Sequence, residues 1–335
     1  MVSSYTFSAE QFEEDLGELT SWLQMLSVPI FKIEGNVLAG DLYPSGFSDP
    51  NAMLCPEMGT ILKALILITS APNHGEKRQS IRRTWGEIAQ RSDVALAFVI
   101  GATYNGSLDY ELEQESSIHG DLIRGNFIDS YRNLTLKTLA MLEWTLTYCP
   151  MTPYLLKTDD DMFINTERLL NFLEAHREDR RKIFGRIAKN SQPHRNSDSK
   201  WYLPEESYRY LVYPDFAAGP IYLLTGDILV DLYQTALKTP FLWLEDVFLT
   251  GFVAEELKIP REDIGKVKNR ADVKRILPCS LAKLVAIHEV TTAEQAEFWK
   301  SFRKCNKTEE ELFGLGQDEN ISDVNLALGY GVRHF

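Results

Sequence analysis

The chain has 335 residues, 44% of them hydrophobic, which suits one large α/β domain or two domains of average size. Its 48 acidic residues outnumber its 35 basic residues, and the formal charge of −13 argues against a nucleic-acid-binding protein, which usually carries a basic face. No run of about 18 apolar residues occurs and the start lacks a signal-peptide pattern, so the sequence predicts a soluble chain.

The expected elements begin with an acidic, turn-rich segment, residues 1–55, which we interpret as a linker with one short amphipathic helix at 9–26. From residue 61, buried strands alternate with amphipathic helices. We expect strands at 61–69, 94–101, 122–128 and 154–158, and helices after them at 78–91, 108–118, 134–149 and 166–178. Further elements are a strand at 182–189, a strand leading into a helix at 221–237, and helices at 245–257 and 293–304.

This alternation predicts a parallel sheet with helices on both faces. Ligands of such sheets bind beyond the carboxyl ends of the strands, and Asp159, Asp160 and Asp161 follow the fourth strand directly. Adjacent carboxylates repel one another. One of them would serve as a helix N-cap, whereas three suit a hard divalent cation with oxygen ligands. Both interpretations remain open from these residues alone.

A metal ion at this edge favours a phosphate-bearing substrate. The chain has neither a P-loop nor a dinucleotide-binding glycine motif, so a nucleoside diphosphate would be held by the metal and by basic side chains. The basic residues on helices expected to begin at this edge are Arg78, Arg82, Arg83 and Lys137. The alternative is that these side chains are merely solvated.

Three features lie further along the chain. Residues 190–215 are a long polar stretch, which we expect to be a lid or binding loop. Glu245 and Asp246 follow an apolar stretch, where burial raises carboxyl pKa values and suits a general base, although a helix cap is the alternative. His288 lies between apolar residues and is either a core residue or a metal ligand.

Six segments stand out together, in this order: "RQSIRRTWG", "FIDSYRNLTLKTLAMLEW", "YLLKTDDDMFIN", "SKWYLP", "YPDFAAGPIYLLTGDI" and "LEDVFLTG". They resemble the β-1,3-galactosyltransferase and β-1,3-N-acetylglucosaminyltransferase family (glycosyltransferase family 31), and within it the galactosyltransferase branch. The resemblance implies a GT-A type nucleotide-sugar transferase fold, with a mostly parallel central sheet flanked by helices, over residues 56–305. Residues 1–55 would be a stem or linker, and residues 306–335 a C-terminal tail.

The resemblance also implies a reaction and its residues. The enzyme would be an inverting, metal-dependent β-1,3-glycosyltransferase that moves galactose from UDP-galactose to a glycan hydroxyl. Asp246 would be the general base. The expected metal ligands, for Mn²⁺ or Mg²⁺, are Asp161, Asp159 and His288; the expected UDP-binding residues are Arg78, Arg82, Lys137, Asp159 and Asp160; and the expected acceptor-binding residues are Glu245, Trp201 and Tyr202.

The four cysteines are far apart and form no C-x-x-C pair, which speaks against a zinc site. The resemblance to the family implies that Cys55 pairs with Cys149 and that Cys279 pairs with Cys305. Family members commonly have two further cysteines where this chain has Ala217 and Phe252, and a small residue where it has Pro220. Four N-x-S/T triplets, at Asn105, Asn133, Asn306 and Asn320, indicate a secretory compartment.

Alternatives to this function are a β-1,3-N-acetylglucosaminyltransferase using UDP-N-acetylglucosamine, a non-catalytic sugar-binding or chaperone module, and a metal-dependent phosphohydrolase. The partners implied are a UDP-sugar donor and the glycan of a glycoprotein or glycolipid, without nucleic acid, and a homodimer is allowed. The resemblance implies the Golgi lumen and a type II membrane protein whose anchor is absent from this sequence.

Overall fold

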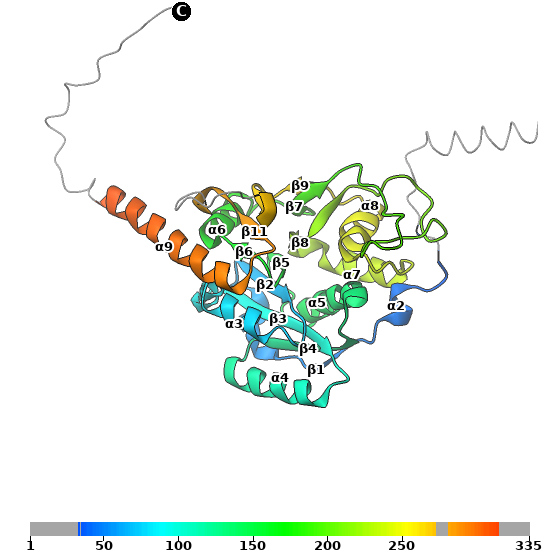
Figure 1. Ribbon diagram of the computed structural model, residues 1–335, viewed down its shortest axis with the longest axis horizontal. Coiled ribbons are helices and arrows are strands. Elements are labelled where there is room, and N and C mark those ends of the chain that lie inside the picture. Colours follow the sequence, from blue (N-terminus) through cyan, green and yellow to red (C-terminus); the bar gives the residue numbers. More distant parts are fainter. Residues whose placement is uncertain (1–32, 34, 273–280, 315–335) are drawn as a thin grey trace, which may run out of the picture. The chain divides into compact units, whose positions relative to one another are not determined.

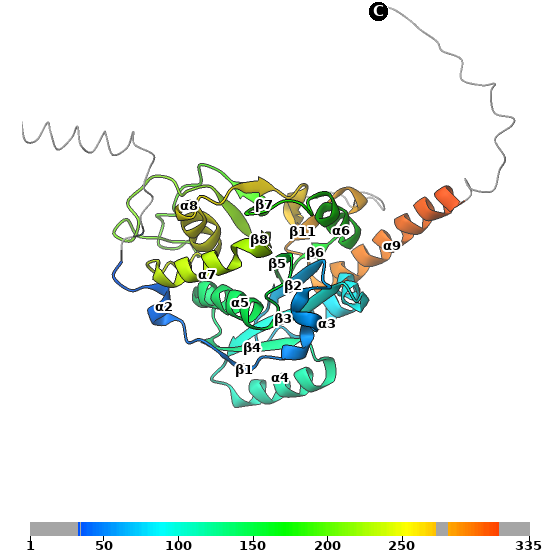
Figure 2. The same cartoon turned by 180° about the vertical axis from the view of Figure 1, so that it is seen from behind.

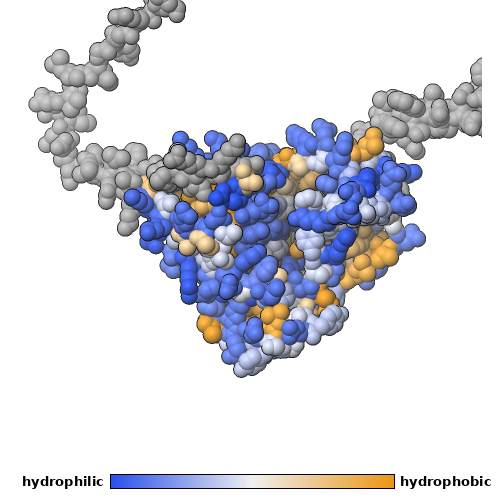
Figure 3. Space-filling view, viewed as in Figure 1, coloured by the Kyte–Doolittle hydropathy of each residue, from blue (hydrophilic) through white to orange (hydrophobic). Residues whose placement is uncertain are grey.

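The computed structural model describes residue 33 and residues 35–272 and 281–314 (Figure 1). The helix expected at 9–26 therefore lies outside the described residues. The chain divides into two compact units: unit 1 comprises residues 1–75, 89–160 and 176–264, and unit 2 comprises residues 76–88, 161–175 and 265–335. Among the described helices, none is both long and apolar enough to span a bilayer. The surface in Figure 3 is mostly hydrophilic, with smaller hydrophobic areas.

Eight described strands of unit 1 form one sheet in the order β1-β4-β3-β2-β5-β8-β7-β9. Their bounds are β1 Phe47–Asp49, β2 Ala64–Thr69, β3 Val94–Ala102, β4 Leu122–Ile128, β5 Tyr154–Asp159, β7 Ile183–Ala188, β8 Phe216–Thr225 and β9 Arg261–Asp263. The neighbours β4, β3, β2 and β5 run parallel to one another, as the sequence predicts. Thr69 at the end of β2 is in register with Asp159 at the end of β5, so the carboxyl ends of these two strands lie side by side.

Helices cover both faces of this sheet. The bounds of the unit 1 helices are α2 Ala39–Leu42, α4 Gly106–His119, α5 Leu134–Tyr148, α7 Leu229–Lys238 and α8 Ala254–Glu256. Successive side chains of a strand point to opposite faces. In β4, Ile123 packs in the same core as Leu139 of α5, whereas the next residue, Arg124, pairs with Asp109 of α4. Helices α5 and α4 therefore lie on opposite faces, and α7 packs beside α5 (Figure 2).

Antiparallel pairing enters the sheet at β8, which the sequence does not predict, whereas β7 and β9 pair parallel. Strand β8 runs antiparallel to both β5 and β7. The connection from β7 to β8, residues 189–215, contains no described helix, and antiparallel neighbours need no crossover helix. The central sheet is thus mostly parallel and flanked by helices, which confirms the expected α/β architecture.

A short strand and a short α-helix lie in the segment 1–55, which is predicted to be a linker. Strand β1 pairs antiparallel with β4 at the edge of the sheet. Helix α2 contacts α7. Just after β1, the carbonyl of Pro50 accepts a hydrogen bond from the indole N–H of Trp144 at 2.6 Å. A three-residue strand shows no alternation in sequence, because its pairing with β4 comes from a distant part of the chain.

Unit 2 has its own sheet. Its described strands are β6 Phe163–Ile164, β10 Val267–Asn269 and β11 Ala286–His288, in the order β10-β11-β6, and its helices include α6 Thr166–Ala175, α9 Thr292–Gly314 and, from residue 76 on, α3 Gly75–Arg82. The ring of Phe163 packs edge-on against Phe298 and Phe302 of α9. Trp85 and Gln295 both donate hydrogen bonds to the carbonyl of Met162, at 2.8 and 2.7 Å. These contacts bury the residues that follow the aspartate triplet.

A disulfide joins Cys55 to Cys149, which confirms the first of the two expected pairs. The second expected pair involves Cys279, which lies outside the described residues. Cys149 directly follows α5 and precedes β5, so the disulfide lies at the amino-terminal end of β5, at the opposite end from Asp159.

Candidate active site

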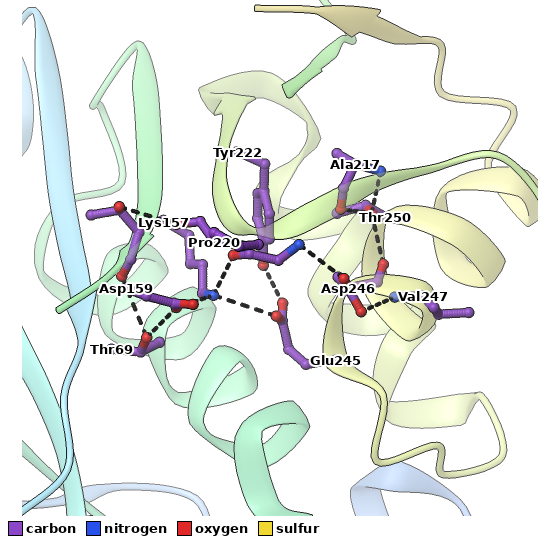
Figure 4. A network of polar contacts seen from close by, with 12 residues as sticks. Thr69, Lys157, Asp159, Ala217, Pro220, Tyr222, Glu245, Asp246, Val247 and Thr250 are labelled. Carbon is purple, nitrogen blue, oxygen red and sulfur yellow. Dashed lines mark hydrogen bonds and ion pairs between the residues drawn. The ribbon is translucent and has the colours of Figure 1, made fainter. Parts of the chain in front are cut away.

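A network of polar side chains lies where β5, β8 and the segment after Leu244 meet in unit 1 (Figure 4). At its edge, Asp159 accepts hydrogen bonds from the hydroxyl of Thr69 at 2.6 Å and from the ammonium of Lys157 at 2.7 Å. Among the described residues, both bonds fall on the same oxygen, Oδ1. The Asp159 side chain is therefore held by the ends of two parallel strands, β2 and β5.

Lys157 is buried, with 3% of its surface exposed, and it directly follows the apolar residues Leu155 and Leu156 of β5. Besides Asp159, its Nζ donates to the carbonyl of Gly219 at 2.6 Å and lies 3.5 Å from Oε2 of Glu245. Burial by itself would lower the pKa of Lys157, but the charges of Asp159 and Glu245 outweigh it and raise that pKa. The side chain is therefore a permanent buried cation between two carboxylates.

Glu245 is also buried, at 5% exposure, and its Oε1 accepts a hydrogen bond from the hydroxyl of Tyr222. Burial raises the pKa of Glu245, and the charge of Lys157 partly offsets this effect. A carboxylate in a low-dielectric environment is costly unless it is paired. Lys157 and Tyr222 are the partners that make its burial tolerable.

Asp246 is the N-cap residue of the π-helix Val247–Val253, which continues into α8. Its Oδ2 accepts the backbone N–H of Gly219 at 2.8 Å, and its Oδ1 accepts the N–H of Val247 at 2.9 Å. Burial raises the pKa of Asp246, while the two N–H groups act in the opposite direction. The carboxylate is therefore fixed in place and more basic than an ordinary aspartate. Both the predicted cap and a basic carboxylate are present in one residue.

The start of the π-helix is tied to β8 by Thr250. Its hydroxyl donates to the carbonyl of Asp246 at 2.7 Å and exchanges hydrogen bonds with the backbone of Ala217, at 2.9 and 3.1 Å. A π-helical turn shifts residues relative to a regular α-helix and occurs frequently at functional sites. Here Thr250, within the π-helix, holds Asp246 against strand β8, which also carries Gly219.

The second aspartate of the triplet, Asp160, has other partners in unit 1. It is buried, and its Oδ2 accepts from the hydroxyl of Ser70 at 2.8 Å and contacts Nδ1 of His74 at 2.7 Å. The carbonyl of Ser70 in turn accepts from the ammonium of Lys137 at 2.6 Å. Lys137 is buried too and pairs with Asp129 at 2.9 Å. Burial lowers the pKa of Lys137, against the opposing effect of Asp129.

The third aspartate, Asp161, belongs to unit 2, as does His288 at the end of β11. Nε2 of His288 lies 3.5 Å from Oδ1 of Asp161, and the backbone N–H of Val290 donates to the Asp161 carbonyl at 2.8 Å. Neighbouring ligand atoms of an octahedral ion with bonds of 2.0–2.1 Å are about 3 Å apart, so this spacing fits a shared cation. Carboxylate oxygen is a suitable ligand for Mn²⁺. Imidazole nitrogen is a common metal ligand in general.

Two expected UDP-binding arginines, Arg78 and Arg82, are on α3 of unit 2. Arg78 is buried at 1% exposure, so it is not a solvated surface arginine. Arg82 is partly exposed. Their roles, like the other expected site roles, stay predictions.

The long loop 190–215 of unit 1 is organised around Arg195. Its guanidinium donates to the carbonyls of Leu203 at 2.8 Å and Tyr210 at 3.2 Å, and also to that of Tyr208. The loop presents Trp201, which is 43% exposed, with the ammonium of Lys200 at 4.5 Å from its ring. Hydrogen bonds therefore hold the loop in a defined conformation that places an aromatic side chain at the surface, while the next residue, Tyr202, is partly buried.

The pKa of Tyr131 responds both to this loop and to the carboxylates. Burial raises its pKa, a hydrogen bond with Trp201 lowers it, and the charges of Asp246 and Asp159 raise it further. The side chain of Tyr131 is half exposed and its ring lies 6.1 Å from that of Trp243. Trp201 and Asp246 therefore both influence the pKa of the Tyr131 hydroxyl.

Sequence reasoning missed several members of this site: Thr69, Ser70, His74, Tyr131, Lys157, Gly219 and Tyr222. One signal was available. Lys157 is a charged residue in the middle of the apolar strand "YLLKTD", two positions before Asp159, and a lysine that is buried there needs an anionic partner. Gly219 and Tyr222 carried no such signal, because their role depends on β8 pairing antiparallel with β5.

Comparison with known proteins gives consistent similarities. Residues 76–265 match the protein family described as galactosyltransferase. The chain is 30% identical over 289 residues to β-1,3-galactosyltransferase 5 of Pan paniscus, an alignment that covers 85% of this chain and 94% of that protein. It is 34% identical over 261 residues to β-1,3-galactosyltransferase 2 of Mus musculus, covering 75% of this chain but 60% of that protein's length.

Solved structures give weaker similarities. A glycosyltransferase involved in the glycosylation of the major capsid of PBCV-1 aligns over 71% of this chain and 98% of its own, with 12% identity and a TM-score of 0.37. The galactosyltransferase LgtC, in complex with donor and acceptor sugar analogs, aligns over 72% of this chain and 95% of its own, with 7% identity and a TM-score of 0.36.

Proposed function

Because the chain belongs to the galactosyltransferase family, we propose that it is an inverting β-1,3-glycosyltransferase that moves galactose from UDP-galactose to a hydroxyl of a glycan acceptor. Membership of the family implies a nucleotide-sugar donor and a glycan acceptor. The choice of galactose and of the β-1,3 linkage follows the names of the relatives and is part of the proposal.

The observation that carries this proposal is the setting of Asp246. A general base must be held within reach of the proton it removes and must have a pKa suited to the task. Two backbone N–H groups, of Gly219 and Val247, fix the carboxylate, and burial raises its pKa. Asp246 takes the proton from the acceptor hydroxyl as that oxygen attacks the anomeric carbon. A single displacement inverts the α-linked donor to a β-linked product.

The donor diphosphate would be held by a divalent cation on Asp161, His288 and Asp159, which precedes Asp161 by two residues in the chain. The ion, proposed to be Mn²⁺ with Mg²⁺ as the alternative, would stabilise the charge of the departing diphosphate. The bond between Asp159 Oδ1 and Thr69 supports this role, since it orients the carboxylate at the edge where ligands bind.

Further UDP contacts are proposed for Arg78, Arg82, Asp160 and Lys137. Lys137 is engaged with Asp129 and Ser70, so its support for UDP binding would come from its charge and from the placement of Ser70 against Asp160. On the acceptor side, Glu245, Trp201 and Tyr202 are proposed contacts. Trp201 supports this assignment because it is an aromatic side chain exposed at the surface, on which a sugar ring could stack.

The proposed location is the Golgi lumen. The disulfide between Cys55 and Cys149 supports an oxidising compartment. Asn105, the first residue of one N-x-S/T triplet, is exposed at the start of α4, where glycan attachment would meet no buried surface.

The test is UDP release from UDP-galactose and from UDP-N-acetylglucosamine, measured with Mn²⁺ or with chelator, against a panel of β-linked sugar acceptors. We expect release from UDP-galactose that requires metal and rises with one class of acceptor. Preference for UDP-N-acetylglucosamine would replace the donor but keep the reaction. Binding of UDP and metal without turnover by any acceptor would favour a sugar-binding module.

A further inference from the structure

Lys157 joins groups that belong to different parts of the proposed reaction. Its Nζ contacts Asp159, a proposed metal ligand, and Glu245, the neighbour of the proposed base. Figure 4 shows this side chain at the centre of the network, reaching from β5 toward β8 and the Glu245 segment. The face of Tyr222 lies 5.6 Å from the same ammonium.

A short chain of hydrogen bonds connects Lys157 to Asp246. The ammonium holds the carbonyl of Gly219 at 2.6 Å, and the N–H of the same glycine holds Asp246 Oδ2 at 2.8 Å. Gly219 is thus fixed from one side by Lys157, while from its other side it fixes the carboxylate. The position of the Asp246 carboxylate depends on that of the Lys157 ammonium through one residue.

We infer that Lys157 is a positioning residue of the proposed transfer, which holds Gly219 and Glu245 in place and thereby aims the Asp246 carboxylate at the acceptor hydroxyl. The inference rests on the proposed function. Lys157 does not itself exchange a proton with substrate in this assignment. It supplies the fixed positive charge around which Asp159, Glu245 and Asp246 are arranged.

A purely structural role does not account for this residue. The neighbours Leu155 and Leu156 show that the strand is built from apolar side chains, and burying an ammonium in such a strand is costly. Well-packed apolar residues commonly replace a buried ion pair without loss of stability. A lysine at this position is explained by the two carboxylates that contact it, those of Asp159 and Glu245.

The second effect of Lys157 is electrostatic. Its charge acts to lower the pKa values of both Glu245 and Asp246, against the effect of burial. Removal of the charge would therefore raise the pH at which the base becomes protonated. A residue that only fills space would leave that pH unchanged.

The test compares Lys157→Met, Glu245→Gln and the double variant with the wild-type enzyme. Lys157→Met alone leaves the buried Glu245 carboxylate without its cationic partner and threatens folding; the double variant removes both charges and avoids this problem. Leu155→Ala, two positions earlier on the same face of β5, is the matched control for loss of stability. The readouts are kcat and KM for donor and acceptor as a function of pH, and Mn²⁺-dependent binding of UDP.

We expect Lys157→Met to lower kcat by about 100-fold, the loss typical of a misplaced reacting group. The acid limb of its pH profile should move to higher pH. In the same way, the acid limb of the double variant should lie at higher pH than that of Glu245→Gln. UDP binding should change little, since Thr69 still holds Asp159. Leu155→Ala should lose stability and keep the wild-type acid limb.

The inference is overturned if the double variant folds and has the kcat and the acid limb of Glu245→Gln. It is also overturned if Leu155→Ala moves the acid limb as far as Lys157→Met does. If the wild-type enzyme transfers no sugar to any acceptor, the proposed function itself fails. Failure of the positioning role and failure of the function are therefore separate results.

Discussion

The N–H of Gly219 donates to Oδ2 of Asp246 at 2.8 Å, and a Cβ added to that glycine would lie 3.2 Å from the same oxygen. Such a contact is tighter than most real Cβ contacts, so any side chain at position 219 would press on the carboxylate that it now holds. The close approach of Asp246 to the backbone at position 219 therefore favours a glycine in this strand.

Gly219→Ala tests this preference. The added methyl group should displace the Asp246 carboxylate and lower kcat by about 10- to 100-fold, with little change in UDP affinity. Gly106→Ala is the control, because a Cβ there meets no atom within 4 Å. The measurement is the steady-state kcat of both variants. If Gly219→Ala has the same kcat as Gly106→Ala, the reaction does not depend on the close contact between position 219 and Asp246.

The pH dependence of the reaction should report Asp246. Because burial raises the pKa of this carboxyl above its usual value, the rate should fall as the pH drops through that raised pKa, at higher pH than for an exposed aspartate. The stability effect has the opposite sign: the proton favours the folded state, and this contribution is lost as the pH rises through the folded pKa. Asp246→Asn should abolish transfer and spare UDP binding.

Removal of a proposed metal ligand should be visible without turnover. His288→Ala should weaken Mn²⁺ binding in the presence of UDP by at least about 10-fold, since one ligand of the proposed site is lost. His176→Ala is a matched control, because His176 also contacts an aspartate, Asp179, at 2.7 Å. Titration of free Mn²⁺ by electron paramagnetic resonance gives the affinities. An unchanged affinity would remove His288 from the metal site.

The disulfide should stabilise the fold without taking part in the reaction. It connects residues 94 positions apart, and loss of such a link costs about 2–5 kcal/mol of the free energy of unfolding. Cys55→Ala with Cys149→Ala should lower the urea midpoint accordingly. At a temperature where both proteins are folded, kcat should stay near the wild-type value, because Cys149 lies at the opposite end of β5 from Asp159.

The sequence by itself determined the parallel half of the sheet. The runs in β2, β3 and β5 are apolar and of strand length, and the helices between them have the spacing of crossover connections. The same pattern predicted that the aspartate triplet follows β5. Local sequence carries this information, because strand and helix periodicities and the short connections between them are local properties.

Only the tertiary structure decided how the Glu245–Asp246 segment is held. Its partners, Lys157, Gly219 and Tyr222, come from strands β5 and β8, whose antiparallel pairing has no local signature. The partners of the aspartates also diverged in a way that three adjacent residues do not reveal: Asp159 is held by Thr69 and Lys157, Asp160 by Ser70 and His74, and Asp161 lies near His288. The sequence contains the residue types of the site. The charges and hydrogen-bond donors that act on them come from distant segments, which long-range packing brings within hydrogen-bonding distance.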